Sequence, residues 1–294
     1  MDENVQLSRR SMLARAGLAI GGVIGASALQ ACGSDDPPAA PVDPGPTVAD
    51  FPYAKHVAAS YQLDVAAVKE AAYQAYFAGG CCHGAYSALL GHLAVTVGKP
   101  FSLLPIDFGK FGGGGVAGYG SICGAALGGA LVINMVVADP AAPDPAVRNP
   151  MIAELLRWYE GQAFPKYVPT ALNAAEVGQT TLDFSAGNLV NLQVTPGSHL
   201  CHASVSGWCA ANGVSASGKD KAARCARLTA DVAGKVAELL NAYLANVALV
   251  PTGRDAASAG CVACHPSSSP TQPVASGMGC TSCHADKVTG HPAP

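Results

Sequence analysis

Two copies of one cysteine motif lie close together near the C-terminus. They read Cys261-Val262-Ala263-Cys264-His265 and Cys280-Thr281-Ser282-Cys283-His284. In each copy, two thiols three residues apart can bond to both vinyl groups along one edge of a porphyrin, and the histidine that follows can bind the iron. This spacing is the attachment signature of c-type heme. We therefore predict two covalent hemes, with His265 and His284 as the proximal iron ligands.

Each heme iron has a sixth coordination position, for which other histidines are candidates. His291 lies only seven residues beyond His284 and is better placed to serve the other heme than its own. His56 lies at the start of the first long predicted helix, whereas His92 falls in an apolar stretch typical of a core histidine. We expect bis-histidine ligation with His56 and His291 as distal candidates, which would keep both reduction potentials low.

Zinc and disulfides are the alternative fates of the four motif cysteines. A zinc ribbon would leave both following histidines unexplained, and its cysteine pairs would be 15 residues apart. Disulfides are common in exported proteins. Residues 251–294 contain no Leu, Ile, Phe, Tyr or Trp, so this segment cannot form a core from its own side chains. Two porphyrins would supply the missing apolar mass, which favours heme.

Six further cysteines lie in the middle of the chain: Cys81, Cys82, Cys123, Cys201, Cys209 and Cys225. Several of them follow glycine-rich turns or begin predicted helices. Backbone N–H groups at such positions stabilise the thiolate form of cysteine, which is the form that binds iron. Inert core thiols and a disulfide between Cys201 and Cys209 are the other possibilities.

The surroundings of these cysteines resemble a family of redox-active proteins that is defined by four cysteines and a Cys-Gly-Ala-x-x-Gly motif. The matching segments are Cys123-Gly124-Ala125-Ala126-Leu127-Gly128, Cys82-His83-Gly84-Ala85, Gly197-Ser198-His199-Leu200-Cys201 and Cys225-Ala226-Arg227-Leu228. Together with the segment from Cys201 to Cys209 and the two heme motifs, they make the chain from about Val57 onward similar to the split-Soret cytochrome c family.

This resemblance implies a mostly helical, dimeric diheme protein whose body also binds an iron–sulfur cluster, with some heme ligation crossing between subunits. It implies Cys82, Cys123, Cys201 and Cys225 as the cluster ligands. Cys81 and Cys209 are additions to the simpler family pattern and are alternates for the fourth ligand.

The N-terminus has the layout of an export signal. Arg9 and Arg10 precede an apolar run from Ala16 to Leu29, and Leu29-Gln30-Ala31-Cys32 resembles a lipobox. We predict a twin-arginine lipoprotein signal peptide over residues 1–31, lipidation of Cys32, a proline-rich tether over 32–52, and a periplasmic protein anchored to a membrane surface. A transmembrane anchor is the alternative, but the apolar run is short for a span.

The elements that must position these residues are predicted to be mainly α-helical. Helical spacing of apolar residues runs from Val57 to Tyr76, before Gly79-Gly80, and from Leu228 to Val247, before Pro251. Further helices are expected over 85–97, 116–138 and 152–159, and a short strand over 190–194. We predict a helical redox domain at 53–250, followed by a small, irregular diheme segment at 251–294.

Composition limits the classes of partner and reaction. With 17 Lys and Arg against 20 Asp and Glu, the net charge of −3 offers no field for a nucleic acid. The glycines at 113–118 match GxGxxG, but without a βα pattern they indicate packing and not a dinucleotide site. The sequence predicts an electron carrier that serves redox partner proteins. A heme- or thiol-based reductase and a redox sensor are the alternatives.

Overall fold

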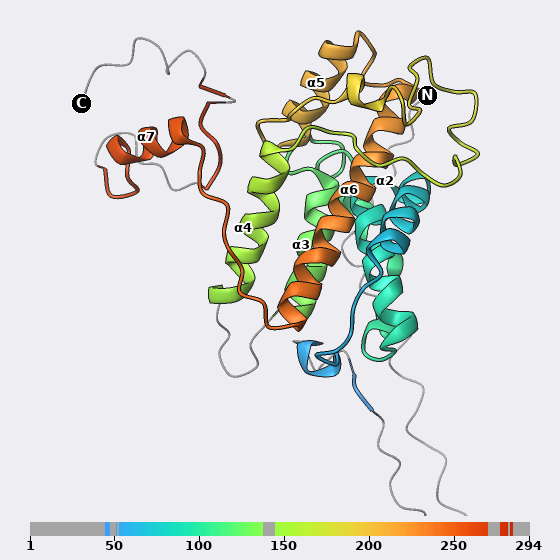
Figure 1. Cartoon of the computed structure of the whole chain (residues 1–294), viewed down its shortest axis with the longest axis vertical. Coiled ribbons are helices and arrows are strands. Elements are labelled where there is room, and N and C mark those ends of the chain that lie inside the picture. The colour runs from blue at the N-terminus through green and yellow to red at the C-terminus, as the bar shows by residue number, and fades with distance from the viewer. Residues whose placement is uncertain are drawn as a thin grey trace, which may run out of the picture. The chain divides into compact units, whose positions relative to one another are not determined.

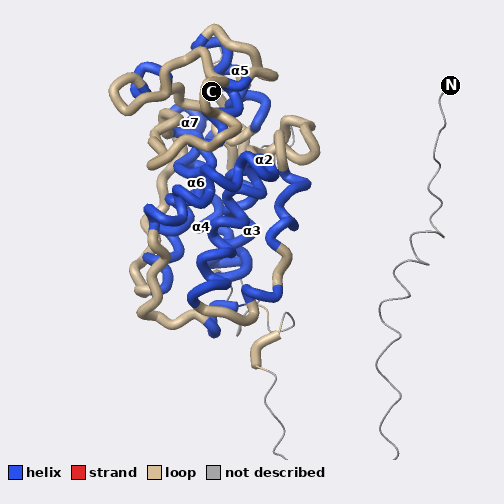
Figure 2. The backbone as a smooth tube through the Cα atoms, turned by 90° about the vertical axis from the view of Figure 1, so that its right-hand side faces the viewer, coloured by secondary structure: helices blue, strands red, loops and turns tan. Residues whose placement is uncertain are grey.

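The computed structural model of the chain describes residues 45–47, 51, 53–137, 145–269, 277–281 and 283–284. The predicted signal peptide, Cys32, most of the predicted tether and His291 lie outside the described residues. Within the described residues the backbone is helix and loop, with two isolated bridges in place of a sheet (Figure 2). The expected mainly α-helical class is confirmed.

Four long helices form the centre of the described structure (Figure 1): α2 (Val65–Thr96), α3 (Gly124–Val136), α4 (Pro145–Gly161) and α6 (Lys219–Leu244). Helix α2 packs along α6 and α3, and α4 packs against α3 and α6. Apolar side chains meet between them and are fully buried, among them Leu89, Leu93, Ile133, Val232 and Leu240. The helices therefore share one core.

A break divides α2 directly before Cys81 and Cys82. The helix begins at Val65, because Asp64 accepts hydrogen bonds of 3.0 Å from the N–H groups of Ala66 and Ala67. The predicted start at Val57 is therefore wrong. At Gly80 the backbone turns to φ 81° and ψ −175°, which only glycine adopts readily. The predicted stop at Gly79-Gly80 is thus a break inside a longer element.

Two other predicted elements differ from the structure. Helix α3 begins at Gly124 and not near Val116, because residues 112–120 form tight turns in which Val116 has a φ of 59°. The predicted strand at 190–194 is instead a short 3-10 helix, η5 (Leu189–Leu192), followed by a single bridge between Val194 and Phe164.

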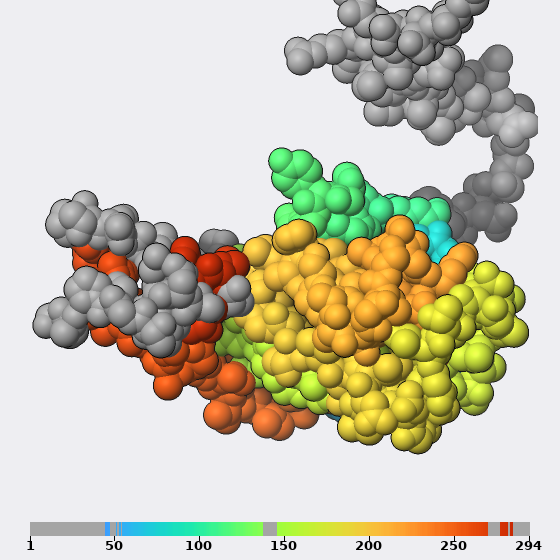
Figure 3. Space-filling model, turned by 90° about the horizontal axis from the view of Figure 1, so that it is seen from above, coloured from blue at the N-terminus to red at the C-terminus, as the bar shows by residue number. Residues whose placement is uncertain are grey.

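A long connection, residues 162–200, joins α4 to α5 (Cys201–Asn212) and covers the end of the bundle seen in Figure 3. A buried ion pair ties it to the helices: Arg227 Nη2 lies 2.6 Å from Glu176 Oε1, and Tyr73 donates a 2.7 Å hydrogen bond to Glu176 Oε2. The last described helix is α7 (Ala256–Cys264). Within the described ranges, every helix is too short or too polar to span a bilayer.

Candidate metal centre and heme-attachment segment

Four cysteines from four helices come together in the core. Cys81 follows the break in α2, Cys123 caps α3, Cys201 begins α5, and Cys225 lies in α6. Electrostatic interactions connect the Cys81 thiol with each of the other three. Cys201 is half-buried and the others are buried. We call these four residues the cysteine cluster.

Backbone hydrogen bonds hold the starts of α3 and α5 together. Cys123 N–H donates to the carbonyl of His199 over 2.8 Å, and Cys201 N–H donates to the carbonyl of Ser121 over 2.6 Å. An antiparallel bridge between Ile122 and Leu200 lies between these bonds. Two thiols that are far apart in the sequence are therefore fixed relative to each other by the main chain.

Glycines allow the neighbouring turns to approach the cysteines. A Cβ atom on Gly112 would lie 2.6 Å from Cys82 Sγ, and one on Gly115 would lie 2.8 Å from Cys201 Cβ. Such distances are too short for carbon and sulfur atoms that are not bonded. The glycine-rich segment thus serves close packing, as the sequence indicated.

A buried arginine provides positive charge beside the cysteine cluster. Arg224 is 1% exposed, its Nη1 lies 3.8 Å from Cys225 Sγ, and its Nη2 donates to Ser204 Oγ over 2.8 Å. Among the described residues, no carboxylate forms an ion pair with Arg224. Because an isolated buried charge is costly, this guanidinium requires an anion at the cysteines.

The two closest thiols have opposite pKa shifts. The hydrogen bond from Cys81 to Cys225 raises the pKa of Cys81, and burial raises it further. The same hydrogen bond lowers the pKa of Cys225 despite its burial, and the positive charge of Arg224 lowers it further. The cluster therefore holds a thiolate at Cys225, which is the form that binds iron.

The remaining two cysteines of the body have different surroundings. Cys82 interacts with Cys123 and faces Gly112, and burial raises its pKa to about 11. Cys209 is buried on α5 beside Trp208. Its pKa is raised mainly by burial and, to a smaller extent, by the interaction with Cys225. The structure thus places Cys81, and not Cys82, opposite Cys225.

The donor set suits an iron–thiolate centre in its chemistry. Its four thiols include the ionised Cys225, and thiolates are ligands that iron prefers. The neighbouring Arg224 guanidinium is always positively charged and would offset negative charge on such a centre. Within the described ranges, no three His, Cys, Asp or Glu side chains are close enough to hold a single metal ion.

The two heme motifs lie side by side in the C-terminal segment. Asp255 caps α7 by accepting a 2.9 Å hydrogen bond from Ser258 N–H, and α7 carries Cys261 and Cys264. The buried Ser258 Oγ accepts a 2.7 Å hydrogen bond from Cys280 N–H. A hydrogen bond also joins the Cys261 and Cys280 thiols.

The remaining motif residues are accessible for heme attachment. Cys264 and Cys283 are exposed. Helix α7 ends at Cys264, with His265 as its C-cap, and His284 N–H donates to the carbonyl of Cys280 over 3.0 Å. In both motifs the histidine therefore follows the last cysteine in a turn.

Of the two distal candidates, only His56 lies in the described structure. It ends η2 (Tyr53–His56), which packs against α3 at the end of the bundle opposite α5 (Figure 1). Its Nε2 is buried and has no hydrogen-bond partner among the described residues. No described part of the heme segment lies near His56. His56 as a distal heme ligand therefore stays a prediction, which requires that it reach a heme of a second subunit.

Sequence reasoning missed three polar residues around the cysteine cluster. Besides Arg224, they are Tyr159 and Ser204, whose hydroxyl groups are 2.8 Å apart in the core. Tyr159 also forms a hydrogen bond with Cys123. Arg224 directly precedes Cys225 in the sequence, and this adjacency was the available signal.

Comparisons with known proteins agree with this geometry. The chain is 33% identical over 183 residues to split-Soret cytochrome c of Desulfovibrio desulfuricans, an alignment that covers 62% of this chain and 60% of that relative. The solved structure of split-Soret cytochrome c from the same species, described as having a novel iron centre, matches with a TM-score of 0.65 and 28% identity. That match covers 79% of this chain and 94% of the other.

The family described as "Putative redox-active protein (C_GCAxxG_C_C)" matches residues 74–239. This range contains α2 from its middle onward, α3, α4, α5 and most of α6, and so all six body cysteines. The chain is therefore a homologue of split-Soret cytochrome c and belongs to the C_GCAxxG_C_C redox-active family.

Proposed function

We propose that the chain is an exported diheme c-type cytochrome that carries single electrons between redox partner proteins and also holds an iron–sulfur centre. One observation carries this proposal: two adjacent CxxCH motifs share a chain with a helical body whose buried thiols lie beside the Arg224 guanidinium. Heme and iron–sulfur groups supply one-electron chemistry when bound.

The chain's own residues have separate tasks in this function. Cys261, Cys264, Cys280 and Cys283 hold the porphyrins covalently, while His265 and His284 bind the irons. Cys81, Cys123, Cys201 and Cys225 hold the iron–sulfur centre, and Arg224 offsets its negative charge. This set replaces Cys82 by Cys81, because Cys81 faces Cys225 and Cys82 faces Gly112.

Adjacent cysteines provide a matched test of the iron ligands. In Cys81→Ser the iron–sulfur absorption should be lost or strongly changed, whereas Cys82→Ser should keep it, since Cys81 interacts with all three other cluster thiols and Cys82 with Cys123. Both variants should retain two hemes. Electron paramagnetic resonance of the reduced proteins measures this. Loss of the signal in Cys82→Ser alone would show that Cys82 is the fourth ligand.

Carbon monoxide distinguishes an electron carrier from a heme reductase. In a carrier both ferrous hemes have two protein ligands, so carbon monoxide should leave the Soret band unchanged. A reductase keeps one position open, and its Soret band would shift. The spectrum of the purified wild-type protein therefore tests the proposed function against the alternative.

The proposed location follows from the N-terminal signal. Export through the twin-arginine route lets the body fold with its iron centre inside the cell, while the C-terminal segment receives heme after export. Lipidation of Cys32 then anchors the protein at a membrane surface. Replacing Arg9-Arg10 by Lys-Lys should abolish export of protein that contains the iron centre, and undiminished export would contradict this order.

We further propose a homodimer, because residues 251–294 have too few apolar side chains to cover two porphyrins. The body also exposes an aromatic patch: Phe108 and Phe111 are 54% and 48% exposed, with ring centroids 6.0 Å apart. They lie in η4 (Ile106–Gly112), in the green segment that stands out in Figure 3. A monomer at micromolar concentration in light scattering, with a simple Soret peak, would contradict the dimer.

A further inference from the structure

We propose that His199, oriented by Glu160, is the distal iron ligand of the heme attached at Cys280 and Cys283. The proposal rests on the proposed function, since it requires a covalent heme at the second motif. Neither residue belongs to a CxxCH motif. The assignment comes from three features of the described structure: an imidazole–carboxylate pair, its contact with the segment before Cys280, and its connection to the cysteine cluster.

His199 and Glu160 form a short, largely buried pair. The distance from His199 Nδ1 to Glu160 Oε1 is 2.7 Å, and the side chains are 13% and 14% exposed. A histidine that binds a metal almost always donates its other ring N–H to a carboxylate or carbonyl. When Nδ1–H donates to Glu160, the tautomer and the ring orientation are fixed, and Nε2 carries the lone pair that can bind iron.

This pair adjoins the residues that lead into the second heme motif. His199 and Glu160 line a hollow of about 350 Å³ together with Gly277 and Met278. At Gly279, the residue before Cys280, a Cβ atom would lie 3.7 Å from Glu160 Oε2 and 3.6 Å from the carbonyl of Gly197. The carboxylate that orients His199 thus lies near the residue that precedes Cys280.

Hydrogen bonds hold the same backbone in place. Arg254 Nη1 donates to the carbonyl of Met278 over 3.4 Å, and Cys280 N–H donates to Ser258 Oγ over 2.7 Å. Gly197 N–H also donates to the carbonyl of Glu160 over 3.0 Å. Hydrogen bonds therefore hold both the turn before His199 and the segment before Cys280, and both contribute residues to the same hollow.

His199 also connects this hollow to the cysteine cluster. Its carbonyl accepts the hydrogen bond from Cys123 N–H, and Cys201 follows it by two residues. A heme iron bound to the His199 imidazole would be connected to Cys201 along the backbone through Leu200, and to Cys123 through one hydrogen bond.

The test removes His199 from the full-length protein that contains both hemes and the iron centre. In His199→Ala, one of the two ferric hemes should change from low spin to high spin, and one of the two ferrous hemes should bind carbon monoxide. Added imidazole should restore the low-spin spectrum. His202→Ala is the matched control, because His202 lies on the next turn and is exposed, and it should leave both spectra unchanged.

A second substitution keeps the test valid if His199→Ala folds poorly. His199→Met retains a side chain of similar size that can bind iron through sulfur. One heme should then show a thioether-to-iron charge-transfer band and a higher reduction potential, as histidine–methionine hemes do. Glu160→Gln should also raise the potential of one heme, because an imidazole without a carboxylate partner donates less charge to ferric iron.

A variant with one heme identifies which iron His199 binds. Cys280→Ser with Cys283→Ser should retain only the heme at Cys261 and Cys264, and adding His199→Ala should leave its spectrum unchanged. The proposal is overturned if that heme becomes high spin, or if both hemes stay low spin in His199→Ala and His199→Met shows no thioether-to-iron band. Absence of covalent heme in the wild-type protein would instead overturn the proposed function.

Discussion

Two buried arginines on successive turns of α6 have different partners. Arg227 forms a two-pronged ion pair with Glu176, with distances of 2.6 and 2.9 Å. Arg224, three residues earlier, contacts the Cys225 thiol and a serine. The first arginine thus has a carboxylate as its counter-charge, and the second has the cysteine cluster. At the scale of single residues, this difference separates a structural role for Arg227 from the role proposed for Arg224 at the cysteine cluster.

Arg224→Met should weaken the iron centre and leave the hemes intact. The substitution removes the cation that offsets negative charge on the thiolates, and loss of such a supporting residue typically costs about 10–100-fold in metal affinity. The reduction potential of any iron centre that remains should fall, because its surroundings become less positive. Iron and heme assays of the purified variant measure both sites. Unchanged non-heme iron and an unchanged potential would contradict the role given to Arg224.

Glu176→Gln should destabilise the fold without affecting the iron centre. Removing one partner of a buried ion pair leaves Arg227 uncompensated, which typically costs about 3–5 kcal/mol. Denaturant unfolding measures this free energy. Glu238→Gln is the control, since Glu238 is an exposed residue of α6 and its substitution should change stability by less than about 0.5 kcal/mol. Equal stabilities of the two variants would show that the pair is not structurally important.

At the scale of elements, periodicity predicted the helices better than their ends. Leu228, Val232, Val236 and Leu240 are buried along α6, as their spacing indicated. The start of α2 was missed, because a side-chain cap at Asp64 determines it and the apolar pattern does not. Likewise α3 begins only where the glycine turns end, although the apolar composition continues upstream without interruption.

The candidate site was predictable only in part for the same reason. Motif spacing separated the four CxxCH cysteines, whose attachment to heme stays a prediction, from the six cysteines of the helical body. The choice between Cys81 and Cys82 depends on the break at Gly80, which sets the direction of each side chain. The roles of Glu160 and His199 depend on a contact across 39 residues of sequence, which no local pattern encodes.

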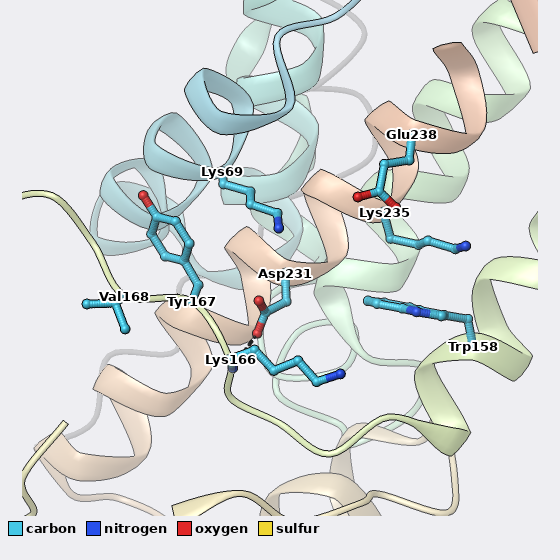
Figure 4. A pocket seen from close by; sticks show the side chains of 8 residues that line it. All are labelled: Lys69, Trp158, Lys166, Tyr167, Val168, Asp231, Lys235 and Glu238. Carbon is cyan, nitrogen blue, oxygen red and sulfur yellow. Dashed lines mark hydrogen bonds between the residues drawn. The ribbon is translucent and has the colours of Figure 1, made fainter. Parts of the chain in front are cut away.

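A buried carboxyl between helices predicts a pH dependence of stability. Asp231 of α6 is 6% exposed and accepts a 2.8 Å hydrogen bond from Lys166 N–H, in a hollow lined also by Lys69, Lys235 and Glu238 (Figure 4). Burial raises its pKa from 3.8 to about 6, although the backbone hydrogen bonds and lysines oppose this shift. Between these pH values the folded protein binds more protons than the unfolded chain, so stability falls as pH rises.

Asp231→Asn should remove this dependence. Asparagine keeps an acceptor for Lys166 N–H but has no charge to bury, so the variant should be more stable than the wild type at pH 7 by up to about 3 kcal/mol. Near pH 4 the two proteins should differ little. Thermal or denaturant unfolding across this pH range measures the difference. The measured quantity is the free energy of unfolding of the variant minus that of the wild type. A smaller difference at pH 7 than at pH 4 would contradict a raised pKa of Asp231.

At the scale of the whole molecule, the chain combines two groups of cysteines in different settings. The helical body gathers buried thiols around Arg224, and the C-terminal segment presents two CxxCH motifs next to the turn that contains His199. The body is rich in core side chains, whereas the segment has few of its own. Two porphyrins bound as proposed would supply the apolar core that the side chains of the segment lack.

The iron-to-heme ratio of protein purified without oxygen tests this account most directly. We predict two covalent hemes in each chain, seen as a mass increase in intact mass spectrometry, and more iron than those hemes contain. The excess iron should be acid-labile together with sulfide, as in an iron–sulfur centre. An unmodified chain mass would contradict the heme assignment, and a ratio of one iron per heme would contradict the centre at the cysteine cluster.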